Sequence, residues 1–159
     1  MGCPGDVPPG GESYGRPMTT DTAPIAQATA DALADEFHRC FSTFTARADL
    51  FADEAFYDLL PPMWRFQIEG PGSAFCDQLR AIAEGPVDIE VVRTLPTPTG
   101  FVTEHVETQH TPGGDMVARR IHVCEVRDGA ITEVTTYCNG GWDDELRARH
   151  AAEAPMIRD

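Results

Sequence analysis

The spacing of apolar residues changes at Gly85-Pro86, and this change constrains the fold more than any other feature of the chain. Before it, apolar residues recur three and four positions apart, as in Leu33, Phe37 and Phe41, which indicates helices. After it, apolar and polar residues alternate, which indicates strands whose side chains point to opposite faces of a sheet. Helices followed by an antiparallel run predict an α+β fold with the helices packed on one face of a curved sheet.

The bounds of the predicted elements follow from this pattern and from the glycines and prolines that interrupt it. Helices are expected over 23–44, over 73–83 with Ser73 as N-cap, and over 142–153. Strands are expected over these five segments: 54–60, 87–95, 101–110, 116–127 and 130–139. Asp49-Leu50-Phe51 is expected to form a short helix or turn.

Composition limits the partners and the location of the protein. Residues 1–22 are rich in Gly and Pro and are predicted to be a disordered tail, followed by a single domain over 23–159. The formal net charge of -14 argues against nucleic acid and against an anionic membrane as partners. The sequence shows no apolar run of membrane-spanning length and no apolar signal segment, so a soluble cytoplasmic protein is expected.

Missing residue types exclude several kinds of chemistry. The sequence contains no lysine, which excludes Schiff-base and pyridoxal phosphate chemistry and a phosphate-binding loop with its lysine. It also has no GxGxxG motif, so no cofactor is predicted. The five cysteines form no CxxC pair and are expected to be free thiols.

A polar stripe on the predicted sheet carries the functional hypothesis. Thr103, His105 and Glu107 alternate along one strand and therefore share a face, and the next strand can add Arg120 and His122 to that face. A base, an acid and a cation side by side are typical of acid–base catalysis. They are equally typical of a solvated sheet face, with Arg120 and Glu107 as an ordinary cross-strand pair.

Periodicity alone places this stripe in solvent. The opposite face carries Val102, Val106, Ile121 and Val123, and the more apolar face is the expected core face.

Two local motifs resemble a known superfamily. The segment 49–55 (DLFADEA) is similar to the DLFADDA segment before the first strand of nuclear transport factor 2-like proteins, and 126–134 (VRDGAITEV) is similar to their late hairpin. The superfamily includes SnoaL-like polyketide cyclases, ketosteroid isomerases and limonene-epoxide hydrolases. The resemblance implies a cone-shaped, antiparallel or mixed sheet with the N-terminal helices over its concave face. It places the polar stripe in a pocket on that face and implies a homodimer through the convex face.

Within this superfamily, Glu104-His105-Val106-Glu107 resembles the E-R-V-D strand of limonene-epoxide hydrolases. The resemblance places His105 at the catalytic arginine, Glu107 at an acid that activates water, and Tyr57 at a water-positioning tyrosine. The second catalytic acid falls at Thr136, which argues against water activation by two carboxylates.

These observations predict a cofactor-independent acid–base enzyme, of cyclase or isomerase type, acting on a hydrophobic small molecule such as a secondary metabolite. The predicted catalytic residues are His105, Glu107 and Tyr57, and the predicted substrate-binding residues are Trp64, Arg120, His122, Thr136, Cys138 and Asn139. The alternatives are an epoxide hydrolase and a non-catalytic ligand-binding or interaction domain. A metal on His105, His122 and Glu107 is not predicted, because the sequence lacks HxH and HExxH motifs.

Overall fold

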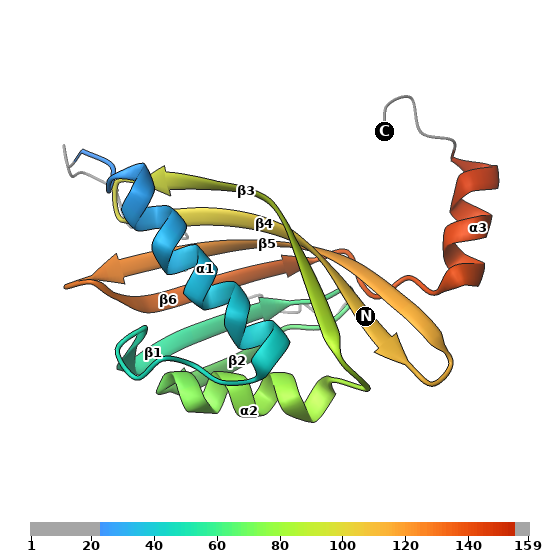
Figure 1. Cartoon of the computed structure of the whole chain (residues 1–159), viewed down its shortest axis with the longest axis horizontal. Coiled ribbons are helices and arrows are strands. Elements are labelled where there is room, and N and C mark those ends of the chain that lie inside the picture. Colours follow the sequence, from blue (N-terminus) through green and yellow to red (C-terminus); the bar gives the residue numbers. More distant parts are fainter. Residues whose placement is uncertain (1–22, 155–159) are drawn as a thin grey trace, which may run out of the picture.

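The computed structural model describes residues 23–154, so the tail predicted over 1–22 lies outside the described residues. Within this range the chain forms three helices and six strands, shown in Figure 1. In chain order they are α1 (Gln27–Thr43), β1 (Phe51–Leu60), β2 (Phe66–Gly70), α2 (Gly72–Ile82), β3 (Val87–Thr97), β4 (Gly100–Thr111), β5 (Gly114–Arg127), β6 (Ala130–Cys138) and α3 (Asp144–Glu153). The predicted α+β class is confirmed.

The strands of the described region form one mixed sheet in the order β2-β1-β6-β5-β4-β3. Strands β3 to β6 make an antiparallel meander, and β1 joins it by pairing in parallel with β6. The pairing register shifts within β1–β6, β3–β4 and β5–β6. Such irregularities bend a strand and increase the local twist of the sheet.

The first two helices cover one face of the sheet. Figure 1 shows α1 crossing this face, where it contacts β3 and β4, while α2 packs on β1 and β2. The expected packing of the N-terminal helix on the sheet is therefore confirmed. Helix α3 contacts β5 and has no buried residue.

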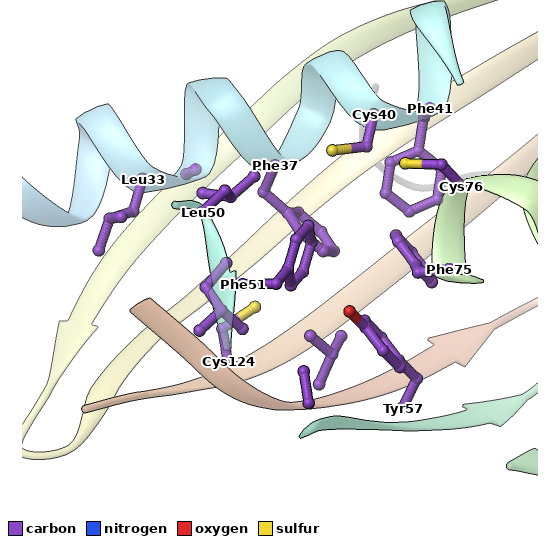
Figure 2. Close-up of a cluster of buried hydrophobic side chains, with 14 of the residues drawn as sticks. Leu33, Phe37, Cys40, Phe41, Leu50, Phe51, Tyr57, Phe75, Cys76 and Cys124 are labelled. Atoms are coloured by element: carbon purple, nitrogen blue, oxygen red, sulfur yellow. The ribbon is translucent and has the colours of Figure 1, made fainter. Parts of the chain in front are cut away.

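An aromatic core fills the space between these helices and the sheet, as Figure 2 shows. The rings of Tyr57 and Phe75 are stacked, with centroids 4.7 Å apart, and the ring of Phe37 is also stacked with that of Phe75, with centroids 6.0 Å apart. Such ring pairs add to the stability that burial of their apolar area already provides.

The structure differs from the expected elements in three places. Strand β2 was not expected, and β1 begins at Phe51, in the segment expected to form a short helix or turn. Both differences come from pairings distant in sequence, because β2 forms only by pairing with β1, and Phe51 pairs with Ile131. The N-cap of α2 is Pro71 and makes no side-chain cap hydrogen bond, so the expected capping by Ser73 is wrong.

No helix among residues 23–154 is both long and apolar enough to cross a membrane.

Candidate functional site

Strand register assembles the polar stripe across three neighbouring strands. In β4–β5, Thr103 lies opposite His122 and His105 lies opposite Arg120. In β5–β6, His122 lies opposite Thr136 and Arg120 opposite Cys138. Because directly opposed residues share a face, these side chains form one polar surface.

This polar surface faces the helices and is buried. Thr103, His105 and His122 are fully buried, whereas Ile121 on the opposite face is 41% exposed. The expectation from periodicity alone is therefore wrong, because the polar face is the one that lies beneath the helices. The physical reason is that the helices bring aromatic rings over the polar face, since Phe41 lies 5.0 Å from His105 and 5.2 Å from His122 between ring centroids.

Helix α1 adds a third histidine, His38, which was not among the predicted site residues. The Nε2 atom of His38 lies 3.1 Å from Oγ1 of Thr103, and its ring lies 5.1 Å from that of His105. The sequence does contain a pattern that identifies His38, because it falls four residues after Ala34 and so lies on the buried stripe of the helix. A polar residue on that stripe is buried, so it needs a hydrogen-bond partner inside the protein.

Burial keeps the three histidines neutral at pH 7. It lowers the pKa of His38 to about 4, with a further contribution from the charge of His105. Burial also lowers the pKa of His105, although the nearby Glu107 acts against it, and it lowers the pKa of His122 well below the usual range.

Several polar atoms of this cluster have no hydrogen-bond partner within the described part of the chain. They are Nδ1 of His38, both ring nitrogens of His105, Nε2 of His122 and the hydroxyl of Tyr57. Leaving such a buried group unpaired costs about 1–3 kcal/mol, so the cluster is not arranged for maximal stability.

A buried ion pair lies next to the histidines. Nε of Arg120 donates to Oε2 of Glu107 at 2.8 Å and its Nη2 to Oε1 at 3.1 Å, a bidentate arrangement. Nε2 of His105 lies 3.9 Å from Oε2 of Glu107. Burial alone would raise the pKa of Glu107, but His105 and Arg120 together lower it. Glu107 is therefore a carboxylate at neutral pH.

Two neighbouring cavities meet at Arg120. The first, of 160 Å³, is lined by Glu107 and Arg120 together with apolar side chains that include Phe41, Leu79 and Val87. The second, of 220 Å³, is lined by Arg120, Thr136 and Cys138 together with apolar side chains that include Leu59 and Phe66. Both also share Ile82 and Gly141, so Arg120 stands at the boundary between two parts of one hollow region.

The remaining predicted site residues lie away from these cavities. Tyr57 is fully buried in the aromatic core and lines neither cavity. Trp64 is 66% exposed in the turn between β1 and β2. The side chain of Asn139 accepts from the backbone N–H of Arg119 and borders a separate hollow that includes Tyr137.

The structure thus brings together six of the nine predicted residues, which are His105, Glu107, Arg120, His122, Thr136 and Cys138. Across residues 23–154, no group of three or more His, Cys, Asp or Glu side chains is placed to hold a metal ion.

No protein-family model matches the sequence, and no curated protein matches it. Solved structures do match. A candidate ketosteroid isomerase from Kribbella flavida is 21% identical, with a TM-score of 0.58 over 78% of this chain and 84% of that chain. An LEH-like epoxide hydrolase from Mycobacterium tuberculosis is 19% identical, with a TM-score of 0.59 over 81% of this chain and 98% of that chain.

A third match is a Mycobacterium tuberculosis protein in complex with estradiol-17β-hemisuccinate. It is 19% identical, with a TM-score of 0.55 over 74% of this chain and 96% of that chain. At these identities the similarity establishes the fold alone, and a common fold is shared by proteins of different function.

Proposed function

We propose that this chain, which has the nuclear transport factor 2-like fold, is a cofactor-independent acid–base enzyme of isomerase or cyclase type that acts on a hydrophobic small molecule. One observation carries the proposal: the bidentate Glu107–Arg120 pair lies at the wall of a largely apolar cavity, with the buried ring of His105 behind the carboxylate. A titratable pair of this kind in a concave apolar site is a typical catalytic arrangement.

The proposed chemistry assigns a separate role to each of the three groups. Glu107, a carboxylate at neutral pH, accepts a proton from a substrate carbon next to a carbonyl group. Arg120 stabilises the negative charge that then develops on the carbonyl oxygen, and its effect is large because the site is shielded from water. His105 stays neutral, because burial lowers its pKa, and its ring lies beside the carboxylate at 3.9 Å.

A hydrophobic substrate fits the walls of the two cavities. The 220 Å³ cavity has mainly apolar lining apart from Arg120, Thr136 and a few other groups. Among the structural matches, one protein holds an estradiol derivative and another is a candidate ketosteroid isomerase. From these two matches we propose the substrate class for this chain, a largely apolar molecule with a carbonyl oxygen. We further propose that this molecule is a secondary metabolite.

Epoxide hydrolysis is the second candidate because of the similarity to an LEH-like epoxide hydrolase. By the resemblance described above, the second acid of that mechanism is replaced by Thr136, which is hydrogen-bonded to His122. One carboxylate at the cavity supports proton abstraction better than water activation by two acids, so we place isomerase or cyclase chemistry first.

The test is hydrogen exchange into carbonyl compounds. Wild-type protein is incubated in D2O with a panel of cyclic β,γ-unsaturated ketones, and deuterium incorporation and double-bond migration are followed by NMR. We expect both with wild type and a fall of roughly 100-fold or more in the Glu107→Gln variant, since general-base catalysis typically contributes that much. Epoxides are tested in parallel by following diol formation.

The matched control is Glu90→Gln, which makes the same change at an exposed position on neighbouring strand β3. Glu90→Gln is expected to behave as wild type. If the wild-type protein binds the ketones but incorporates no deuterium into them, the proposed enzymatic function is contradicted and a ligand-binding domain is favoured. Diol formation that depends on Glu107 would favour the hydrolase.

A further inference from the structure

We propose that the site selects apolar ketones whose carbonyl group lies between a smaller reacting part and a larger apolar part, and that Ile82, Arg120 and Gly141 form the neck that enforces this choice. The smaller part would occupy the 160 Å³ cavity beside Glu107, and the larger part would occupy the 220 Å³ cavity. This inference rests on the proposed function and adds to it the orientation and the size limit of the substrate.

The neck consists of the residues that line both cavities. Three residues do so: Ile82, Arg120 and Gly141. They come from separate parts of the chain, because Ile82 is the last residue of α2, Arg120 lies within β5 and Gly141 follows β6. A ligand too large for one cavity must therefore pass between these three residues.

The two cavities differ in the chemistry that they offer. Glu107 lines the 160 Å³ cavity, whereas the lining that residues 23–154 give the 220 Å³ cavity contains no carboxylate. The carbon that loses a proton must lie within reach of the base, and hence in the 160 Å³ cavity.

The carbonyl oxygen is expected in the neck itself. Nε and Nη2 of Arg120 donate to Glu107, whereas its Nη1 makes no hydrogen bond among residues 23–154 and can donate to a carbonyl oxygen. A ketone bound in this way has its reacting carbon on one side of the neck. The rest of the molecule then lies on the other side, in the larger cavity.

The absence of a side chain at Gly141 matters for space. Its backbone is not in the left-handed region, so its conformation does not require glycine. A Cβ atom at this position would lie 2.8 Å from Cε of Met116, which lines the 160 Å³ cavity. Since this contact is too short, the end of the Met116 side chain would have to move. Glycine at position 141 therefore keeps the space on this side of the neck open.

Hydrogen bonds hold the neck on two sides. Next to Gly141, the backbone N–H of Trp142 donates to the carbonyl of Val117 at 2.8 Å, and the N–H of Val117 donates back at 3.0 Å. Near the end of α2, Nη2 of Arg80 donates at 2.6 Å to the carbonyl oxygen of the residue that caps α1. Ile82 is 52% exposed, so this side of the neck borders solvent and serves as the entrance. A neck anchored in this way can select ligands by width.

The first test measures which end of an unsymmetrical ketone reacts. Wild-type protein in D2O is given 6-pentyl-3-cyclohexenone, whose chain is on the far side of the carbonyl from the reacting carbon, or 4-pentyl-3-cyclohexenone, whose chain is on the reacting side. Each rate of deuterium incorporation is divided by the rate in buffer without protein. We expect the normalised rate to be roughly 10-fold or more higher for the 6-pentyl isomer, because its chain fits the larger cavity. Equal normalised rates, or a faster 4-pentyl isomer, would overturn the inference.

The second test needs no turnover and addresses the Gly141 side of the neck. Binding of the saturated ketone 2-pentylcyclohexanone is measured by protein NMR. We expect Gly141→Ala to weaken binding by roughly 10-fold or more, and addition of Met116→Ala to restore it, because the new contact is with Met116. The matched control is Gly113→Ala, since a Cβ atom there has an ordinary contact at 3.7 Å, and this variant should bind as wild type does. Unchanged binding by Gly141→Ala, or a loss that Met116→Ala does not restore, would overturn the role of Gly141.

The entrance side of the neck is tested with a bulkier ligand. 2-tert-Butylcyclohexanone places its bulk next to the carbonyl, at the neck. We expect Ile82→Ala to bind it roughly 10-fold more tightly than wild type does. Ile121→Ala makes the same change at a residue that is 41% exposed on the opposite face of the sheet, and it should leave binding unchanged. Equal binding by the two variants would overturn the role of Ile82.

These outcomes separate the inference from the proposed function. Exchange by wild type without preference between the two pentyl isomers would contradict the inference and leave the proposed function standing. Absence of exchange, with binding that still depends on Gly141 and Ile82, would contradict the enzyme and leave the neck standing. Failure of wild type to bind any of these ketones would overturn both.

Discussion

At the scale of single residues, Arg120 takes part in more features of the site than any other predicted residue. Its guanidinium is bidentate to Glu107, lies 5.9 Å over the ring of Phe41 and borders both cavities. Without it, Glu107 would remain as a buried and unpaired charge. Truncating one partner of such a pair costs more than the pair itself contributes.

We therefore expect Arg120→Gln to lower the free energy of unfolding by about 3 kcal/mol and to raise the pKa of Glu107, because burial then acts without the opposing charge. Urea denaturation measures the stability, and ¹³C NMR of the glutamate carboxyl groups measures the pKa. The control is Arg47→Gln, which breaks a pair with Asp49 that is exposed on both sides and should change stability by about 0.5 kcal/mol or less. Similar losses in the two variants would refute the prediction.

The residues of the site were predictable to different degrees. Alternation along a strand was enough to place His105 and Glu107 on one face, and the next strand brought Arg120 and His122 there. That this face is the buried one depended on resemblance, because by composition the opposite face is the more apolar. Trp64 was expected in the pocket wall, but its exposure depends on the path of the β1–β2 turn, which no local pattern specifies.

At the scale of elements, long meander strands with regular alternation were predictable and short elements formed by distant pairing were not. Strands β4, β5 and β6 lie close to their expected bounds. Strand β2 alternates apolar and polar residues, but it has only five residues and is largely exposed, so the pattern is too short to identify a strand. Helix α3 was visible because Asp144 and Glu145 lie in its first turn, where the helix dipole favours negative charge.

Helix α3 depends on its cap more than on packing. The side chain of Asp143 accepts a hydrogen bond from the backbone N–H of Leu146, and no residue of the helix is buried. We expect Asp143→Ala to destabilise the helix by about 1 kcal/mol, which increases amide hydrogen exchange over 144–153. Exchange in α1 should be unchanged, since α3 opens locally without disturbing the core. A fall in global stability of the same size would show instead that α3 is coupled to the core.

At the scale of the whole molecule, the buried histidines make stability depend on pH. The folded-state pKa values of His38, His105 and His122 lie below the usual value of 6.5. As the pH falls, the unfolded chain therefore binds more protons at these histidines than the folded chain does. Stability is fully present above pH 6.5 and is lost below it, by up to about 1.4 kcal/mol per pH unit for each histidine.

Urea midpoints measured between pH 7.5 and 5.0 test this expectation. The exposed His110 has its pKa raised by Asp88 and Asp115, so it acts in the opposite direction, and His110→Gln should make the acid loss steeper. Stability that is constant over this range would mean that the three histidines are not held neutral by burial.

The parallel pairing of β1 with β6 also decides when the protein can form during its synthesis. Strands β1 and β2 join the rest of the sheet only through β6, the last strand in the described sequence. A nascent chain that has left the ribosome up to β5 still holds its first hairpin unattached to the meander. Folding must then wait for residues 130–138, so the sheet closes late, by a contact between distant parts of the chain.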